Sequence, residues 1–408
     1  MSALLAMALL CAEPTPHGPL FIANSAVGSP NIGTLGTFDE SFAVSLAQPN
    51  AIIKAGQLVD LVRAEVRSPK WPGTAQVVLA NGDRLPLVAP LGGDATTTKF
   101  TVMLARHGAS QSISVPLTAI AGVWFSDVSA DDLLARPWFD PSRKSDAIKL
   151  RNGDVLRGTF ERFSDTGAVL FQPSGEKVAK TFEVANLQAL AIEPGLTRVR
   201  KPRTAFSKVV LLNGARMSVT GLSLKANTWQ GTLLTGAKVS FPLEELYRVD
   251  VELGLAVSLT ELKPKAIRFE PYGGLTWPEQ TNRNAKGECL ILKTTRGEEM
   301  FDTGLGLHSK TTLTYDLAGK YTRFEAILGL DANTGQKGHV EVSFLLDGVA
   351  QKWDDNKELS YLGGVKPVFL DVTKARELML IVDYGQRGDV QDDVNIVHPK
   401  LILAAPVK

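Results

Sequence analysis

The chain has 408 residues, which is enough for two to four domains. Its formal net charge is +1, so it carries no basic field that would concentrate nucleic acid or bind an anionic membrane. Its hydrophobic fraction of 44% and charged fraction of 21% are those of an ordinary globular protein.

A short apolar run, Ala3 to Ala12, lies at the N-terminus. It is too short to span a bilayer and is similar to the apolar core of a secretory signal peptide. We therefore expect residues 1–12 to be an export signal, and the mature chain to be secreted, periplasmic or part of the cell envelope without a membrane-inserted segment. A lipoprotein anchor at Cys11 is the alternative, but Leu9 and Leu10 lack the small residue that such a site prefers. Without this segment Cys289 is the last remaining cysteine, so no internal disulfide is expected.

Three Asn-Gly dipeptides mark an internal repeat in the first two-thirds of the chain. Each separates two apolar runs, and the asparagines are Asn81, Asn152 and Asn213. Asn-Gly supplies the positive φ angles of a type I′ turn, so the pattern predicts three hairpins at equivalent positions. Each copy continues through further short strands and a short turn or 3₁₀ step to a last apolar strand. About five strands in roughly 50 residues are typical of a small, strongly bent barrel and resemble Sm-like folds.

The repeats predict the domain boundaries of this part. We expect a β-rich region at 18–126 with the first barrel-like unit, a second unit at 145–194 and a third at 205–257, and Gly33 to Arg63 as a further, degenerate copy. The basic run between the last two units is typical of a solvated linker. Small repeated units bury little surface each, so we expect them to pack on one another as a scaffold.

The last third alternates with period two. Thr312, Thr314 and Asp316 interleave with apolar neighbours, which predicts a half-buried strand. Tyr321 to Leu330 follows as a second strand, and further strand-length runs come after it, two of them separated by the hairpin dipeptide Asp347-Gly348. Several short strands with turn signals between them indicate an all-β sandwich.

Two motifs in this third carry a family resemblance. The sequence GLGLHS at Gly304 to Ser309 and the closing VNIVHPKL at Val394 to Leu401 resemble the NPCBM domain, which is found in carbohydrate-binding modules and attached to secreted glycosidases. The resemblance covers 265–407. It implies a jelly-roll, galactose-binding-like β-sandwich that binds glycans or glycoproteins, with a glycosidase or envelope protein as a further partner. The closing motif departs from the family pattern at Asp393, Ile396 and His398. At these three positions the family pattern resembles His, Trp and Asp.

Four residues are the candidate carbohydrate-binding side chains: His308, Asp392, Asp393 and Asn395. A neutral imidazole donates and accepts at once, which suits a sugar hydroxyl, although a hydrogen-bonded structural histidine is the alternative for His308. The acidic run that begins at Asp389 suits sugar recognition, a structural calcium ion or simply a solvated turn. Trp353, in another loop, is expected to pack in the core rather than to form a stacking platform.

No catalytic motif is present in the sequence. It lacks a G-x-S-x-G elbow, a P-loop, a dinucleotide fingerprint and the H-E-x-x-H and C-x-x-C metal patterns, and its five histidines are scattered. The sequence therefore predicts an all-β, exported, non-catalytic protein in which repeated Sm-like barrels precede a carbohydrate-binding sandwich. A structural or protein-interaction scaffold of the cell envelope that binds no sugar is the alternative.

The export hypothesis has a direct test. If residues 1–12 are a signal, the mature N-terminus begins after Ala12, because signal peptidase cleaves behind small residues. N-terminal sequencing of the native protein reads this position. A cytoplasmic protein that retains Met1 would contradict the prediction.

Overall fold

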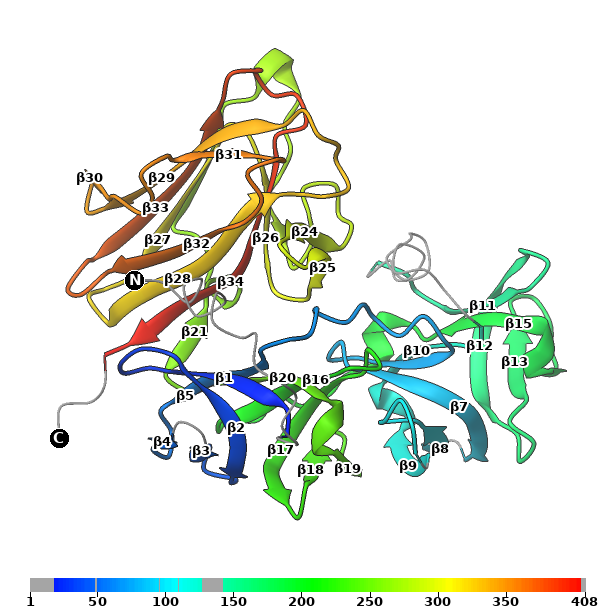
Figure 1. The fold of residues 1–408 in the computed structure, drawn as a ribbon. Helices are drawn as coiled ribbons and strands as arrows, with labels where there is room; N and C mark the ends of the chain where they lie inside the picture. The colour runs from blue at the N-terminus through cyan, green and yellow to red at the C-terminus, as the bar shows by residue number, and fades with distance from the viewer. Residues whose placement is uncertain (1–17, 48–49, 95, 109, 127–141, 405–408) are drawn as a thin grey trace. The chain divides into compact units, whose positions relative to one another are not determined.

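The computed structural model describes residues 18–47, 50–94, 96–108, 110–126 and 142–404. The predicted export signal at residues 1–12 lies outside this range. The described chain forms two compact units, one of residues 18–254 and one of residues 255–404. Both are built from β-strands and short 3₁₀ helices, so the all-β prediction is confirmed (Figure 1). Within the described ranges, no helix is both long and apolar enough to cross a membrane.

The N-terminal unit contains four successive groups of five strands. Barrel 1 is made of β1 (Leu20–Ser25), β2 (Asn31–Phe38), β3 (Val44–Ala47), β4 (Asn50–Ile53) and β5 (Leu58–Arg63). Barrel 2 is made of β6 (Gln76–Leu79), β7 (Arg84–Gly93), β8 (Thr97–Val102), β9 (Gln111–Pro116) and β10 (Ile120–Trp124). The repeat therefore starts at Leu20, because barrel 1 is complete and includes a strand before Gly33.

The remaining two groups repeat this plan. Barrel 3 is made of β11 (Asp146–Leu150), β12 (Val155–Phe163), β13 (Val169–Pro173), β14 (Lys180–Phe182) and β15 (Leu187–Ala191). Barrel 4 is made of β16 (Phe206–Leu211), β17 (Arg216–Lys225), β18 (Thr228–Leu233), β19 (Lys238–Pro242) and β20 (Leu246–Glu252). In barrels 2 to 4 the 3₁₀ helices η2 (Leu117–Ala119), η3 (Val184–Asn186) and η5 (Leu243–Glu245) precede the last strand.

All four barrels share one strand order and one irregularity. In each barrel the first strand pairs with the second and with the fifth. The second strand also pairs with the third, and the third with the fourth. In every barrel the pairing of the first and fifth strands skips the second residue of the fifth: Val59, Ala121, Gln188 and Tyr247. The second strand also changes register along its length, and such bulges bend a strand sharply enough for a small sheet to curl.

The three Asn-Gly turns lie between the first and second strands of barrels 2, 3 and 4. The type I′ prediction for them is wrong, because only the glycine of each turn has a positive φ. Each turn is a three-residue loop closed by a glycine bulge; the Gly82 amide donates to the Leu79 carbonyl, and the Leu79 amide donates to Asp83. The asparagine instead accepts a hydrogen bond from the amide two residues on, as Asn152 Oδ1 does at 3.1 Å from Asp154.

The barrels associate in pairs through their fifth strands. β5 pairs antiparallel with β20, with Leu61 opposite Val249, and β10 pairs antiparallel with β15, with Val123 opposite Leu190. These four residues are each the fourth of their strand, so both pairs use the same register. Aromatic rings cross each interface: Phe38 meets Trp229 at 5.0 Å between centroids, and Phe100 meets Phe163 at 5.8 Å. Barrel 1 therefore completes its core with barrel 4, and barrel 2 with barrel 3.

A buried charge cluster fixes the junction of barrels 1 and 4. Arg248 on β20 donates to Asp250 at 2.6 Å and, across the interface, to Asp60 of β5 at 3.1 Å. Asp60 is only 4% exposed, and Asn24 donates to its second oxygen. A buried carboxylate that lost this cation would keep its desolvation cost without the compensating attraction.

The C-terminal unit is a sandwich of two antiparallel sheets. One contains β21 (Ala256–Ser258), β23 (Gln280–Thr281), β26 (Gly304–His308), β28 (Tyr321–Leu330), β32 (Lys366–Asp371) and β34 (Asp393–Leu403). The other contains β22 (Ala266–Phe269), β27 (Thr311–Asp316), β29 (His339–Leu346), β30 (Val349–Ala350), β31 (Glu358–Ser360) and β33 (Glu377–Tyr384). A separate hairpin is made of β24 (Leu290–Thr294) and β25 (Gly297–Phe301).

The strands of this unit follow the sequence pattern closely. Alternate residues of β27 and β28 fill the core between the sheets, among them Leu313, Tyr315 and Phe324. The turn at Asp347-Gly348 joins β29 to β30 with positive φ at both residues, as a type I′ turn requires. Trp353 packs edge-on against Phe344 at 5.8 Å and donates to the Val342 carbonyl, so it belongs to the core.

The Arg248 cluster makes a measurable contribution to stability. Arg248→Met should lower the free energy of opening the barrel 1–barrel 4 junction by about 3 kcal/mol, because two carboxylates lose their buried partner. Hydrogen exchange of the β5 and β20 amides measures this locally, and about 3 kcal/mol corresponds to roughly a hundredfold loss of protection.

Lys180→Met is the matched control for this experiment. Lys180 pairs with Glu176 at 2.7 Å, but the two side chains are 58% and 41% exposed. Exposed pairs contribute about 0–1 kcal/mol, so protection should hardly change. Equal protection in the Arg248 variant and the control would show that the cluster does not hold the junction.

Candidate functional site

The four predicted site residues lie together at one end of β26 and β34. His308 is the last residue of β26 and lies opposite Asp393, the first residue of β34. The expectation of an acidic loop needs correction, because Asp393 and Asn395 belong to the strand. All four side chains are also buried, with exposed fractions of 7% for His308, 0% for Asp392, 2% for Asp393 and 0% for Asn395.

The glycines of the GLGLHS motif make this arrangement possible. A Cβ at Gly306 would lie 2.3 Å from the Arg283 carbonyl oxygen and 2.5 Å from the Asn284 Cα. Without a side chain there, the segment that carries Arg283, Asn284 and Lys286 packs directly on β26. This close approach brings Lys286 Nζ to 3.5 Å from Asp393 Oδ2.

His308 and Asp393 face each other with unused hydrogen-bonding capacity. His308 Nδ1 lies 2.7 Å from the Ser309 carbonyl oxygen, which can only accept, so Nδ1 carries the proton. In the neutral ring Nε2 is therefore an acceptor, and it lies 3.8 Å from Asp393 Oδ1. Asp393 Oδ1 is buried without a hydrogen-bond partner in the described structure. Burial raises the pKa of Asp393, while His308 and Lys286 act in the opposite direction.

Asp392 plays a structural part beside them. Its Oδ2 accepts from Ser309 Oγ at 2.8 Å, and its Oδ1 accepts from the His339 amide at 3.0 Å. Burial raises the pKa of this carboxyl. Asp392 thus ties the end of β26 to the start of β29, and its oxygens are already occupied.

Asn395 leads to a residue that the sequence analysis missed. Asn395 Nδ2 donates to Oδ2 of Asp331, at the end of β28, and to the Ile291 carbonyl at 3.2 Å. Asp331 is fully buried, and burial raises its pKa to about 6. Asn395 Oδ1 has no partner in the described structure. The site therefore contains two buried acceptor oxygens, on Asp393 and Asn395, that the described protein leaves unused.

Trp277 is the second missed residue. Its ring stacks on His308, with 5.6 Å between centroids and 25° between planes, and it stays 38% exposed. Ile396, at the position where the family resemblance implied a tryptophan, is 0% exposed and packs in the core. The exposed aromatic surface therefore comes from the loop before β23. The isolated tryptophan among Pro and Gly residues in FEPYGGLTWPEQTN was the signal that could have identified it.

In the described part of the chain, no three His, Cys, Asp or Glu side chains gather in a way that could hold a metal. A structural calcium ion at Asp389, Asp392, Asp393 and Asn395 would have to share the Asp392 oxygens, which already accept hydrogen bonds from Ser309 and the His339 amide.

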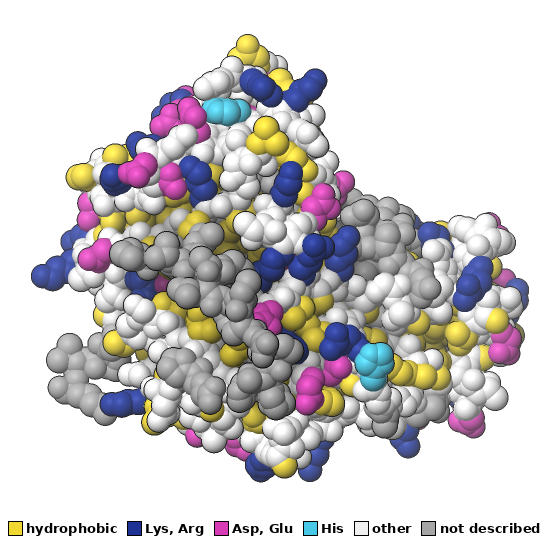
Figure 2. Space-filling model, viewed as in Figure 1, with side chains coloured by type: hydrophobic (Ala, Val, Ile, Leu, Met, Phe, Trp, Pro, Cys, Tyr) yellow, Lys and Arg dark blue, Asp and Glu magenta, His cyan; other side chains and the backbone are white. Residues whose placement is uncertain are grey.

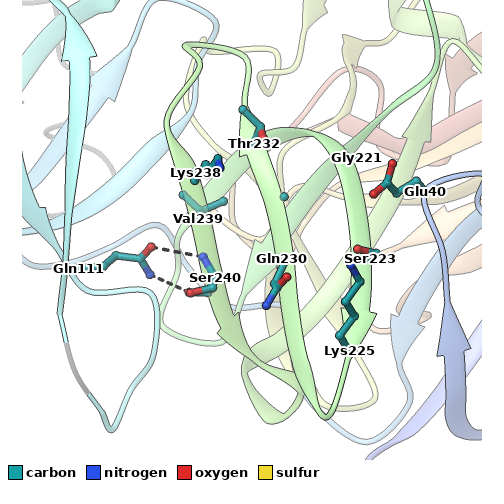
Figure 3. Close-up of a pocket in the computed structure, with 11 residues that line it drawn as sticks. Glu40, Gln111, Gly221, Ser223, Lys225, Gln230, Thr232, Lys238, Val239 and Ser240 are labelled. Carbon is teal, nitrogen blue, oxygen red and sulfur yellow. Dashed lines mark hydrogen bonds between the residues drawn. The ribbon is translucent and has the colours of Figure 1, made fainter.

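A cavity of about 340 Å³ opens elsewhere, in the N-terminal unit. β17, β18 and β19 form one side of it, with Glu40 of barrel 1 and Gln111 of barrel 2 at its rim (Figure 3). The Gln111 side-chain amide donates to the Ser240 carbonyl at 2.7 Å and accepts from the Ser240 amide at 3.3 Å. These two hydrogen bonds let Gln111 cover part of the β19 edge. His308, Asp392, Asp393 and Asn395 do not line this cavity.

The buried Asp331 makes stability depend on pH. Its carboxyl stays protonated in the folded state up to about pH 6, but ionises near pH 4 in the unfolded chain. The folded state binds more protons between these values, so the stability of the C-terminal unit falls as the pH rises from 4 to 6. Asp331→Asn removes this dependence, and relative to wild type it should gain about 2–3 kcal/mol between pH 4 and pH 7. Urea unfolding at both pH values measures the difference; parallel stability curves would contradict it.

Comparisons with known proteins place the C-terminal unit in a family. Residues 259–402 match the family model described as the NPCBM/NEW2 domain. No curated protein matches the chain. Among solved structures, the chain is 25% identical to the CBM51 module of a Clostridium perfringens GH95 protein in complex with methyl-galactose, with a TM-score of 0.33, covering 36% of this chain and 99% of that one.

Two further structures are similar. The CBM51-2 and INT domains of Clostridium perfringens ZmpB, in complex with GlcNAc, are 19% identical with a TM-score of 0.34, and the match covers 46% of this chain but only 38% of that one. The tandem CBM51 modules of a family 98 glycoside hydrolase from Streptococcus pneumoniae are 12% identical with a TM-score of 0.34, over 81% of this chain and 99% of that one. The family match, the sandwich and the GLGLHS strand agree: the C-terminal unit is an NPCBM/NEW2 domain, a non-catalytic module of the carbohydrate-binding type.

Proposed function

We propose that the C-terminal unit binds a glycan of galactose type at Trp277 and His308, and that the whole chain is an exported, non-catalytic binding protein. The observation that carries the proposal is the half-exposed Trp277 ring stacked on His308, next to the buried and unpartnered oxygen of Asp393. Aromatic surface beside polar groups that lack partners is what a sugar ring requires, because one face of the ring is apolar and its edge carries hydroxyls.

Each polar group has a distinct role in this proposal. A sugar hydroxyl donates to Nε2 of neutral His308, whose Nδ1 proton is fixed by the Ser309 carbonyl. A second hydroxyl donates to Asp393 Oδ1 once a shift of the neighbouring side chains exposes this buried oxygen, and it supplies the hydrogen bond that the oxygen lacks. Lys286, whose side chain is 41% exposed, offers donors on the open side. Asp392 and Asn395 hydrogen-bond within the protein, to Ser309 and the His339 amide and to Asp331 and the Ile291 carbonyl, and so stabilise the strands that carry the site.

A scaffold role remains the second candidate, and the N-terminal unit favours it. Four barrels paired through their fifth strands form continuous sheets from barrel 1 to barrel 4 and from barrel 2 to barrel 3, which suits a scaffold. In this proposal the barrels present the sugar-binding unit on a cell envelope or to a glycosidase partner. If the sandwich binds no sugar, the scaffold role describes the whole chain.

Substitution of the platform tests the proposal. Trp277→Ala and His308→Ala should each weaken glycan binding about tenfold or more, because one removes the stacking surface and the other leaves a hydroxyl unpaired. Titration calorimetry with methyl-galactose and GlcNAc, after a screen on a glycan array, measures the affinities.

Phe369→Ala is the matched control, since Phe369 is an aromatic with 55% exposure on β32, at the other edge of the same sheet. The Phe369→Ala variant should bind the glycan with the same affinity as wild type. Circular dichroism should show that all variants are folded. Equal binding by Trp277→Ala and wild type would place the site elsewhere. A wild type that binds no glycan would favour the scaffold role.

A further inference from the structure

The loop that carries Trp277 has a second fixed aromatic at its other end. Tyr272 lies in the 3₁₀ helix η7 (Tyr272–Gly274), and its ring meets Tyr384 edge-on at 5.9 Å and 75°. The Tyr384 hydroxyl in turn donates to the Glu270 carbonyl. Gly273 and Gly274 both have positive φ, which lets the chain turn tightly between the two aromatics. Tyr272 at one end and Trp277 at the other are thus each held by a ring contact.

This loop exposes much of its apolar surface. Tyr272 is 62% exposed and Leu275 is 71% exposed. The loop reaches the end of the C-terminal unit drawn uppermost in Figure 1, and Figure 2 shows hydrophobic side chains exposed beside Lys and Arg side chains at this end. A tyrosine held in one orientation loses little rotamer freedom when a ligand covers it, so its exposed face is suited to binding.

A pair of charged hydrogen-bonding groups lies near Glu270, where the loop begins. Lys310 follows His308 by two residues, and its Nζ pairs with Asp383 Oδ2 at 3.2 Å. The Lys310 carbonyl accepts from the Glu270 amide at 3.0 Å, which places it beside the start of the loop. Lys310 and Asp383 are partly exposed and offer donors and acceptors together. An aromatic ring and polar side chains thus occur at the start of the loop, as they do near Trp277.

The separation of the two aromatics limits what can cover both. Five residues span at most about 17 Å when extended, and the 3₁₀ turn between them shortens this because its rise is only about 2 Å per residue. One sugar ring stacks on one aromatic side chain, so a ligand that covers both Tyr272 and Trp277 needs at least two rings.

We propose that Tyr272, with Lys310 and Asp383, forms a second sugar subsite beside Trp277 and His308, so that the unit recognises oligosaccharides of at least two rings. This inference rests on the proposed function, because it extends the same site. The terminal sugar binds on Trp277, and the next rings of the glycan bind along the loop toward Tyr272.

The test compares a single sugar with a longer one. Affinities of the full chain are measured by calorimetry for methyl-galactose, for lactose and for a galactose-terminated tetrasaccharide. Tyr272→Ala should leave the affinity for methyl-galactose within about twofold of wild type, and should weaken binding of the tetrasaccharide about tenfold, the size of effect expected for one stacked ring.

Two variants serve as controls. Leu362→Ala removes apolar surface that is 85% exposed but lies outside this loop, so neither ligand should be affected. Trp277→Ala should weaken both ligands, because both place a sugar ring on that platform. Circular dichroism of each variant verifies the fold.

The outcomes separate the two proposals. If wild type and Tyr272→Ala bind the tetrasaccharide equally, while Trp277→Ala loses binding, the second subsite is wrong and the proposed function stands. If Tyr272→Ala weakens methyl-galactose as much as the tetrasaccharide, Tyr272 only supports the first site and the inference is overturned. If wild type binds none of the three ligands or any array glycan, both proposals fail.

Discussion

Every hydrogen-bonding group that folding removes from water needs a partner, and this requirement organises both units of the chain. A five-stranded barrel of about 45 residues leaves the outer edge of its fifth strand unpaired and encloses only a small core. The N-terminal unit resolves both problems at once. β5 pairs with β20 and β10 pairs with β15, so that each edge finds backbone partners, and aromatic residues of each barrel complete the core of the other.

The same requirement underlies the site proposed in the C-terminal unit. Asp392 has donors on both of its oxygens, and its role is to hold strands together. Asp393 and Asn395 each retain one buried oxygen for which the described protein provides no donor. Such groups are costly in a folded protein and are therefore rare unless something else supplies the hydrogen bond. Beside them, Trp277 keeps part of its ring in contact with solvent although most large side chains of the unit are packed.

Local patterns in the sequence predicted the elements well and the contacts between them less well. Period-two alternation located β27 and β28 nearly residue by residue, because it reports which face of a strand is buried. The Asn-Gly dipeptides located three turns but not their type, since the asparagine side chain stabilises the turn without a positive φ. The family motif led to His308 and Asp393. Trp277 and Asp331 were missed, because each joins the site through contacts with distant segments that no local pattern encodes.

The order in which the barrels pair has a consequence for how the chain is made. Barrel 2 joins its immediate successor, barrel 3, whereas barrel 1 joins barrel 4, and Asp60 meets Arg248 across 188 positions of sequence. The pairing is nested, because barrels 2 and 3 lie in the sequence between barrel 1 and its partner, barrel 4. During synthesis the inner pair can close while β5 still lacks its partner, and that strand edge stays open until β20 has left the ribosome. The first strands to be made thus complete their pairing last, after the intervening barrels have been synthesised.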